Sequence, residues 1–207
     1  MMRGMEGSRM LFTSEEIQSR VRELGEEITR DYRGRAPTLV SVLKGGSVFL
    51  ADLFRQIDLP VRVDFMSISH YSEGDDQSGV VRVLKDLDDD VIEQDVIVVE
   101  DIIDTGLTLS YLLAALRARE PASLEVCTLL DRSARRIPPL DIRYRGFDCP
   151  DVFVVGYGLD VGERYRNLPF ILELDRERAQ GNDPDALVPY LSGALPLDAA
   201  EAAGAAD

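Results

Sequence analysis

The chain has 207 residues, enough for one domain with a hydrophobic core and too few for a second domain of normal size. Its 23 basic and 38 acidic residues give a net charge of −15, which argues against nucleic acid as the main partner because backbone phosphates would be repelled. Two cysteines are too few for a disulfide framework, and no apolar window reaches membrane-spanning length, so we expect a cytoplasmic protein with buried thiols and no membrane partner.

The first half of the chain alternates helical and extended patterns. Thr13 and Glu16 have the spacing of a capping box, and apolar residues then recur at helical spacing until Gly34. The elements predicted after this helix are a strand at 38–43, a helix at 47–56, a strand at 61–69, a mobile polar loop at 71–79 and an antiparallel strand at 80–84.

The second half continues the alternation. Four β-branched residues, 96–99, predict a buried strand, and an apolar stripe over 107–119 predicts a helix. Short apolar runs at 124–130 and 152–157 predict two further strands. Strands that alternate with helices indicate an α/β fold with a parallel sheet covered on both faces, in which ligands bind beyond the carboxyl ends of the strands.

The last part of the chain has a different composition. From about Gln180 it is rich in Ala, Asp, Gly and Pro and lacks an apolar stripe. We therefore expect one domain over residues 1–179, followed by a flexible or weakly docked acidic, Ala-rich tail over 180–207.

The connection between the strand at 96–99 and the following helix has the most informative chemistry. Three carboxylates, two hydroxyls and a glycine fall within nine positions, namely Glu100, Asp101, Asp104, Thr105, Thr108 and Gly106. A short Thr/Gly loop before a helix N-terminus presents unpaired backbone N–H groups and a positive dipole end to an anion. Carboxylates beside such a loop are costly unless a cation or a hydroxyl-rich ligand lies between the charges. A sugar phosphate carrying Mg²⁺ satisfies both requirements.

This segment resembles the phosphoribosyl-pyrophosphate (PRPP) motif of purine phosphoribosyltransferases, in the version of the hypoxanthine-guanine members. The similarity runs in unbroken order from about Phe12 to Asp175. Besides residues 100–106, it is carried by residues 43–46, 69–71 with 78–79, 129–132, and 153–160 followed by 164–166. The resemblance implies the type I phosphoribosyltransferase fold, a Rossmann-like parallel sheet flanked by helices with a small hood formed from the terminal segments.

The resemblance implies roles for the acidic loop. Asp104 would be catalytic and would manage the proton at N7 of a purine, although an aspartate at this position could instead only cap the helix. Glu100 and Asp101 would face the ribose hydroxyls and their Mg²⁺, the alternative being solvated carboxylates at a strand end. The PRPP ribose and phosphate would be bound by Glu100, Asp101, Asp104, Thr105, Gly106, Leu107 and Thr108.

The same resemblance implies the remaining site residues. Lys44, Gly45 and Arg166 would bind pyrophosphate, and the loop at Lys44 can carry a non-proline cis peptide in the family. Asp160 would hold a second Mg²⁺ on pyrophosphate through oxygen ligands. The purine would be bound by Ile102, Arg132, Phe153 and Val154.

Two positions depart from the family pattern. Arg132 stands where the family usually has Lys, whose ammonium donates to the 6-oxo group of the base, and the longer planar fork of arginine needs a wider pocket or another pose. His70 stands where the family usually has Ser, before Tyr71 in the flexible loop expected to close over the site. His70 is the only histidine, which excludes Ser-His-Asp catalysis and multi-histidine zinc sites. It is either a solvated loop residue or a contact to pyrophosphate.

The resemblance implies a Mg²⁺-dependent transfer of 5-phosphoribosyl from PRPP to hypoxanthine or guanine, which gives IMP or GMP and pyrophosphate. One alternative is a phosphoribosyltransferase with shifted preference, such as xanthine, which Arg132 could permit. Another is a non-catalytic regulator that senses PRPP. Members of the family commonly form homodimers or homotetramers, and the sequence does not choose between these states.

Overall fold

The computed structural model describes residues 8–71, 80–175 and 187–191. The chain divides into two compact units. The central unit is Arg20–Pro150, and the terminal unit combines Met1–Ser19 with Asp151–Asp207. The boundary falls inside helix α1, Ser14–Asp31, so each unit contains a part of this helix.

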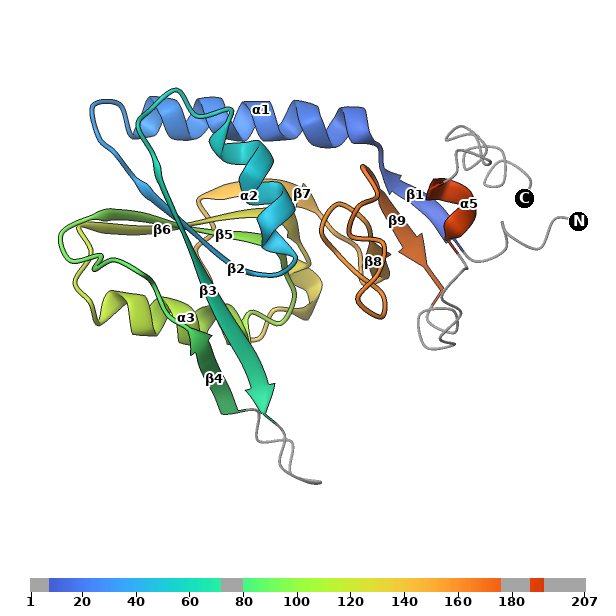
Figure 1. The fold of residues 1–207 in the computed structure, drawn as a ribbon. Coiled ribbons are helices and arrows are strands. Elements are labelled where there is room, and N and C mark those ends of the chain that lie inside the picture. The colour runs from blue at the N-terminus through green and yellow to red at the C-terminus, as the bar shows by residue number, and fades with distance from the viewer. Residues whose placement is uncertain (1–7, 72–79, 176–186, 192–207) are drawn as a thin grey trace, which may run out of the picture. The chain divides into compact units, whose positions relative to one another are not determined.

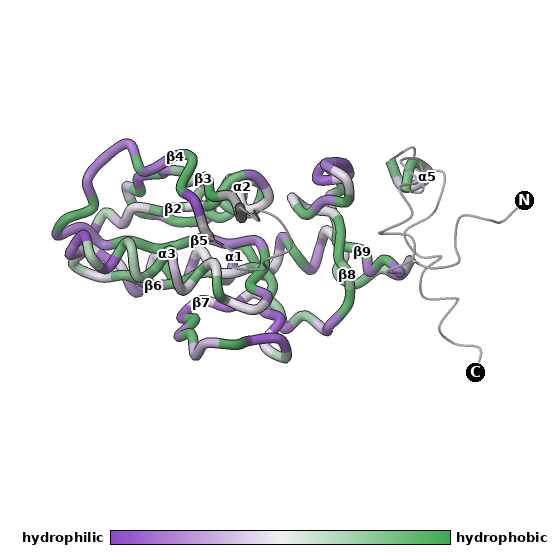
Figure 2. Tube along the Cα trace, turned by 90° about the horizontal axis from the view of Figure 1, so that it is seen from below, coloured by the Kyte–Doolittle hydropathy of each residue, from purple (hydrophilic) through white to green (hydrophobic). Residues whose placement is uncertain are grey.

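The central unit is built on a six-stranded sheet (Figure 1). Its strands are β2 Thr38–Leu43, β3 Arg62–Tyr71, β4 Val80–Lys85, β5 Asp95–Ile103, β6 Ser123–Asp131 and β7 Tyr144–Asp148. They lie in the order β4-β3-β2-β5-β6-β7, and all neighbours are parallel except β3 and β4. The buried strands at the centre, β2 and β5, are hydrophobic over most of their length (Figure 2).

Helices cover both faces of this sheet (Figure 1). Helix α3, Leu107–Arg117, buries its leucine stripe in a core with alternate residues of the central strands, among them Val40, Val98 and Val126. Helix α2, Gly46–Phe54, packs on the opposite face over β2 and β5. The predicted parallel sheet with helices on both faces is confirmed.

The central-unit part of α1 is tied to the edge of the sheet at β7. Arg20 donates from Nη2 to the carbonyl of Arg145 at 2.6 Å and from Nε to that of Gly146 at 3.2 Å. At the other end of the helix, the carboxylate of Asp31 accepts from the Tyr144 hydroxyl at 3.1 Å. The charged face of this helix therefore serves as an anchor for the edge strand.

The terminal unit contains a small antiparallel sheet. Its strands are β1 Ser8–Phe12, β9 Ile171–Leu174 and β8 Phe153–Val155, in the order β1-β9-β8. A separate core around Phe170 and Leu172 includes Leu187, which is 1% exposed and precedes the short helix α5, Val188–Leu191. The two ends of the chain thus build one unit, as the predicted hood requires.

Several predicted elements are confirmed with shifted ends. The capping box exists, because Glu16 N–H donates to Thr13 Oγ1 at 3.2 Å and Thr13 N–H donates to Glu16 Oε2 at 2.8 Å. β4 pairs antiparallel with β3 as expected. Two details are corrected: β5 continues to Ile103, and β3 continues to Tyr71, so the backbones of His70 and Tyr71 belong to a strand rather than a loop.

Parts of the prediction fall on residues that the structure does not describe. They are loop residues 72–79 and, within the expected tail, residues 180–186 and 192–207. Residues 187–191 of the tail pack into the terminal unit, and the domain boundary near 180 remains a prediction. In the described part of the chain, no helix is long and apolar enough to cross a membrane.

Candidate active site

The carboxyl ends of three neighbouring parallel strands bring the predicted residues of the central unit together. Val99 of β5 is in register with Ser41 of β2, and Ile103 of β5 with Asp131 of β6. The segments that follow these strands therefore emerge at one end of the sheet. Open α/β sheets bind ligands at this end, beyond the carboxyl ends of the strands.

A pocket of about 290 Å³ lies at this end of the sheet. Its wall combines carboxylates, a hydroxyl-bearing loop and apolar side chains. The lining residues are Val42, Ile68, Glu100, Ile102, Ile103, Asp104, Thr105, Gly106, Thr108 and Leu109. Six of the residues predicted from the acidic loop, including Ile102 for the base, therefore share one concave surface.

The loop before α3 has the geometry of an anion cradle. Gly106 is the N-cap of the helix with φ of 79°, a left-handed conformation that favours glycine. The carbonyl of Thr105 accepts from the Ile137 N–H at 3.0 Å, which fixes the loop from behind. The first N–H groups of α3 have no acceptor within the helix and add to its positive dipole end. The Leu107 N–H lies 3.5 Å from Thr105 Oγ1, so the Thr105 hydroxyl faces the same helix start.

Asp104 is held by arginines and does not cap α3. Its Oδ2 accepts from Arg135 Nη1 at 3.0 Å and lies 3.4 Å from Arg132 Nη1. Its Oδ1 is buried and has no hydrogen-bond partner among the described residues. Because α3 has no side-chain cap, the capping alternative is wrong. One oxygen of the carboxylate is held by arginines, and the other is buried without satisfying its hydrogen-bonding capacity within the described residues.

Glu100 and Asp101 lie in the last part of β5 and not in the loop. Burial raises the pKa of the Glu100 carboxyl well above its usual range, and the neighbouring Asp101 charge raises it further. Asp101 Oδ1 accepts from the Ile102 N–H at 2.8 Å. Two adjacent carboxylates with mutual repulsion suit a cation.

The donor set fits Mg²⁺ in a particular way. No group of three or more His, Cys, Asp and Glu side chains within residues 8–71, 80–175 and 187–191 could hold a metal ion. Mg²⁺ commonly binds through one or two carboxylates and takes its other ligands from water and substrate phosphates. Glu100 lines the pocket and matches that pattern, whereas its neighbour Asp101 is not among the lining residues; a closed site built only of protein does not exist in the described residues.

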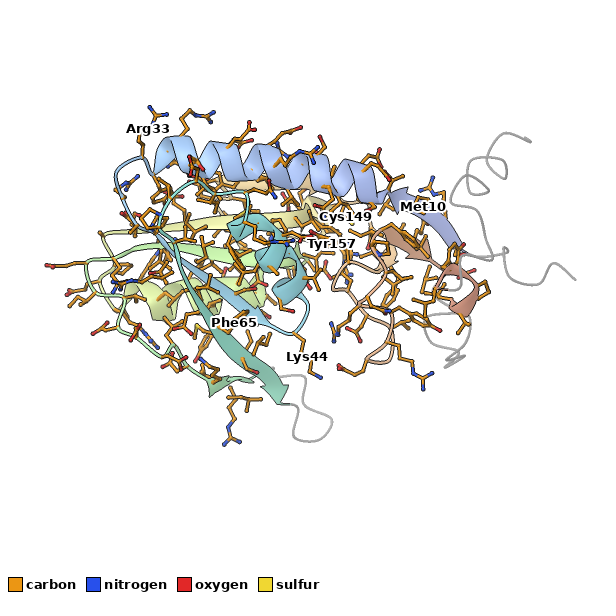
Figure 3. All side chains as sticks on the ribbon, turned by 45° about the horizontal axis from the view of Figure 1, so that its top comes forward. Met10, Arg33, Lys44, Phe65, Cys149 and Tyr157 are labelled. Atoms are coloured by element: carbon orange, nitrogen blue, oxygen red, sulfur yellow. The ribbon has the colours of Figure 1, made fainter. Side chains whose placement is uncertain are left out.

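The loop after β2 follows the family expectation in its backbone. The Leu43–Lys44 peptide bond is cis, and the Lys44 carbonyl accepts from Ser47 Oγ at 2.6 Å. A Cβ on Gly46 would clash with Ser41 Oγ, so the loop packs directly on the strand ends. Lys44 is exposed, and Figure 3 shows its side chain extending away from the loop.

The end of β6 and the segment after it contain charged residues near the site whose contacts the sequence did not reveal. Asp131 is 1% exposed, forms an ion pair with Arg136 and lies 2.9 Å from Arg145 Nε. Arg135, in turn, reaches Asp104. The run of arginines after Arg132 was a visible signal, but their partners lie on other elements and no local pattern identifies them.

The departure at Arg132 is now located. This side chain is 7% exposed and approaches the carboxylate of Asp104. Cys149 lies beside it, and burial raises the pKa of the Cys149 thiol. Both cysteines are free and buried, as expected. A buried guanidinium next to the predicted catalytic carboxylate is consistent with a role at the base.

The terminal unit contains four predicted residues, which we describe within that unit alone. Phe153 is 36% exposed and Val154 is buried, and both lie on β8, an edge strand of its sheet. Asp160 Oδ2 accepts from the Glu163 N–H at 2.8 Å, and its Oδ1 lies 2.9 Å from Arg166 Nη2. Arg166 also donates to the Gly158 carbonyl at 2.8 Å. Asp160 and Arg166 are therefore brought together, and the half-exposed aromatic is compatible with stacking.

Comparison with known proteins gives consistent results. A sequence model of the phosphoribosyl transferase domain matches residues 8–161. The hypoxanthine-guanine phosphoribosyltransferase of Mycobacterium avium is 51% identical over 172 residues, covering 80% of this chain and 85% of the relative. That of Bacillus subtilis (strain 168) is 47% identical over 163 residues, covering 79% and 91%. A crystal structure of a hypoxanthine phosphoribosyltransferase from Staphylococcus aureus has a TM-score of 0.78 at 43% identity, covering 82% of this chain and 92% of that one.

Proposed function

The chain belongs to the phosphoribosyltransferase family, and on this premise we propose that it transfers 5-phosphoribosyl from PRPP to N9 of hypoxanthine or guanine, giving IMP or GMP and pyrophosphate. Its fold is the type I phosphoribosyltransferase fold, and it is a pentosyl transferase of purine salvage. The observation that carries the specific proposal is the pocket at the end of β5, where acidic residues and an anion cradle share one wall.

The central unit supplies the groups for the sugar phosphate. The 5′-phosphate would be bound by the backbone N–H groups of Leu107 and Thr108 and by the hydroxyl of Thr105. Gly106 has no side chain, so the phosphate could come close to the backbone there. Glu100 and Asp101 would orient the ribose hydroxyls. Glu100 and Asp101 would also hold one Mg²⁺, and Asp160 would hold a second Mg²⁺ on the pyrophosphate. The metal would supply positive charge that neutralises the leaving group.

Asp104 is the proposed catalytic residue. Its carboxylate, which Arg135 holds at Oδ2, would hold the proton at N7 of the purine while N9 attacks C1 of the ribose. Positive charge develops on the ribose as pyrophosphate leaves, so placed charges matter more than a covalent nucleophile. We propose no nucleophilic side chain.

The base and the leaving group would be bound by the remaining predicted residues. Arg132 would donate to the 6-oxo group, with Ile102, Phe153 and Val154 forming the rest of the purine site. Lys44, Gly45 and Arg166 would bind pyrophosphate. His70 and Tyr71, at the end of β3, would belong to the closing segment.

We also propose that the protein is cytoplasmic and forms a homodimer or a homotetramer. Sedimentation at several protein concentrations would distinguish the two assemblies.

Pyrophosphate release tests the proposal. With PRPP and Mg²⁺ present, hypoxanthine and guanine should each support release, and adenine should not, because its 6-amino group would face the Arg132 guanidinium donor to donor. Chelation of Mg²⁺ should abolish release with every base. The proposal would be contradicted if adenine were the only base that supported pyrophosphate release, or if pyrophosphate were released without any base.

Arg132 is the specific reason to retain xanthine as a second candidate. Competition among hypoxanthine, guanine and xanthine at fixed PRPP measures the three values of kcat/KM together. A dominant xanthine rate would identify the shifted enzyme. A PRPP sensor without catalysis would instead bind PRPP in calorimetry and release no pyrophosphate with any base.

A further inference from the structure

The residues on either side of the 3-10 turn η1, Ser133–Arg135, form hydrogen bonds to the two neighbours of Asp104 in the chain. The N–H of Arg132, just before the turn, donates to the carbonyl of Ile103 at 3.0 Å. The N–H of Ile137, just after it, donates to the carbonyl of Thr105 at 3.0 Å. The residues immediately before and after Asp104 are therefore each hydrogen-bonded to the same short segment.

The turn is itself fixed to the sheet. Arg136, at its end, forms an ion pair with Asp131, a carboxylate that is 1% exposed at the end of β6. The aliphatic part of Arg136 also packs near Gly106, where an added Cβ would come within 3.0 Å of Arg136 Cδ. Side-chain and backbone contacts thus join the turn to both β6 and the acidic loop.

Arg135 extends from this fixed turn to one oxygen of Asp104. Its Nη1 donates to Asp104 Oδ2 at 3.0 Å, and Arg132 approaches the same oxygen only to 3.4 Å. Asp104 Oδ1 is left buried and without a hydrogen-bond partner in the described part of the chain. A carboxylate with one oxygen fixed cannot rotate about its Cβ–Cγ bond without breaking that hydrogen bond.

We propose that Arg135 is a positioning residue, whose hydrogen bond to Asp104 Oδ2 fixes the orientation of the carboxylate that meets the purine proton. The inference rests on the proposed function, because it assigns Arg135 a task in the same reaction. Without Arg135, Oδ2 keeps only the longer contact to Arg132 at 3.4 Å, and the carboxylate is free to rotate. Errors of about 1 Å in the placement of a catalytic group can cost about 100-fold in rate.

The test is a double-mutant cycle on Asp104 and Arg135. Arg135→Ala should lower kcat by roughly 10- to 100-fold in the wild-type background, with the KM for PRPP changed less than about threefold. Arg135→Lys should recover part of the loss because a donor remains. In the Asp104→Asn background, Arg135→Ala should change kcat by less than about threefold, since a residue that acts through Asp104 has little left to position.

Arg119→Ala is the matched control. Arg119 pairs with Asp86 at 2.8 Å on the surface and does not line the pocket, so its loss should leave kcat unchanged. Equal losses from Arg135→Ala in both backgrounds would overturn the inference and indicate a direct contact to substrate. An unchanged kcat in Arg135→Ala alone would also overturn the inference. The proposed function would survive that result, because it rests on the activity of the wild type. If the wild type itself released no pyrophosphate, the proposed function would be the part that failed.

Discussion

Replacing Asp104 with asparagine should lower kcat roughly 100-fold or more, while the KM for PRPP changes little. The amide oxygen of asparagine can still accept from Arg135, so the geometry around Oδ2 survives. The amide lacks the charge that holds a purine proton, and general acid–base groups contribute about 10²- to 10⁴-fold. Steady-state kinetics with hypoxanthine as the varied substrate at saturating PRPP would measure the loss.

Asp89→Asn is a suitable control, because Asp89 is an exposed carboxylate between β4 and β5 and does not line the pocket. It should have the wild-type kcat. A wild-type rate for Asp104→Asn would remove this carboxylate from the mechanism. A large rise in the KM for PRPP at constant kcat would instead assign Asp104 to substrate binding.

Gly106→Ala should both destabilise the protein and weaken PRPP binding. The left-handed backbone costs a non-glycine residue about 1–2 kcal/mol. The added Cβ would also come within 2.6 Å of Leu140 Cδ1, and such overpacking typically costs a further ~1–3 kcal/mol. Displacement of the loop moves the N–H groups at the start of α3, so the KM for PRPP should rise. Urea unfolding and steady-state kinetics measure the two effects.

The chain offers a matched control for backbone strain. Gly34 also has φ of +79°, and nothing lies within 4 Å of a Cβ built there. Gly34→Ala should therefore lose only the conformational part of the free energy of unfolding and keep the wild-type KM for PRPP. If the two variants lost equal stability and had equal KM values, the proposed packing of the phosphate loop would be wrong.

Hydrophobic pattern was sufficient to predict the central elements of the fold. The strands β2, β5 and β6 are apolar because both of their faces are covered, and α2 and α3 have clear buried stripes. The strands β1, β7 and β9 were not predicted. They have four or five residues each, and β1 pairs with β9 across more than 150 positions, so only tertiary contacts define them.

The candidate site divides in the same way. Local chemistry predicted the residues of the acidic loop, since a strand, carboxylates, a glycine and a helix start are consecutive in the chain. Local sequence could not predict that Arg135 binds Asp104 or that Asp131 binds Arg136, because each contact depends on how β5 and β6 are paired. The strand extension to Ile103 also followed from pairing with β6, not from propensity.

That extension has an energetic consequence for substrate binding. Glu100 pairs with Thr128 of β6, and Asp101 lies between this pair and the pair Ile102–Leu130, so their backbones are already ordered before any ligand arrives. Binding therefore avoids most of the conformational entropy that a flexible loop would lose, about 1–2 kcal/mol for each residue fixed. It also means that the two carboxylates cannot relieve their repulsion by moving apart, which together with burial keeps the pKa of Glu100 well above its usual range; under the proposed function, a cation brought by the substrate would relieve that repulsion.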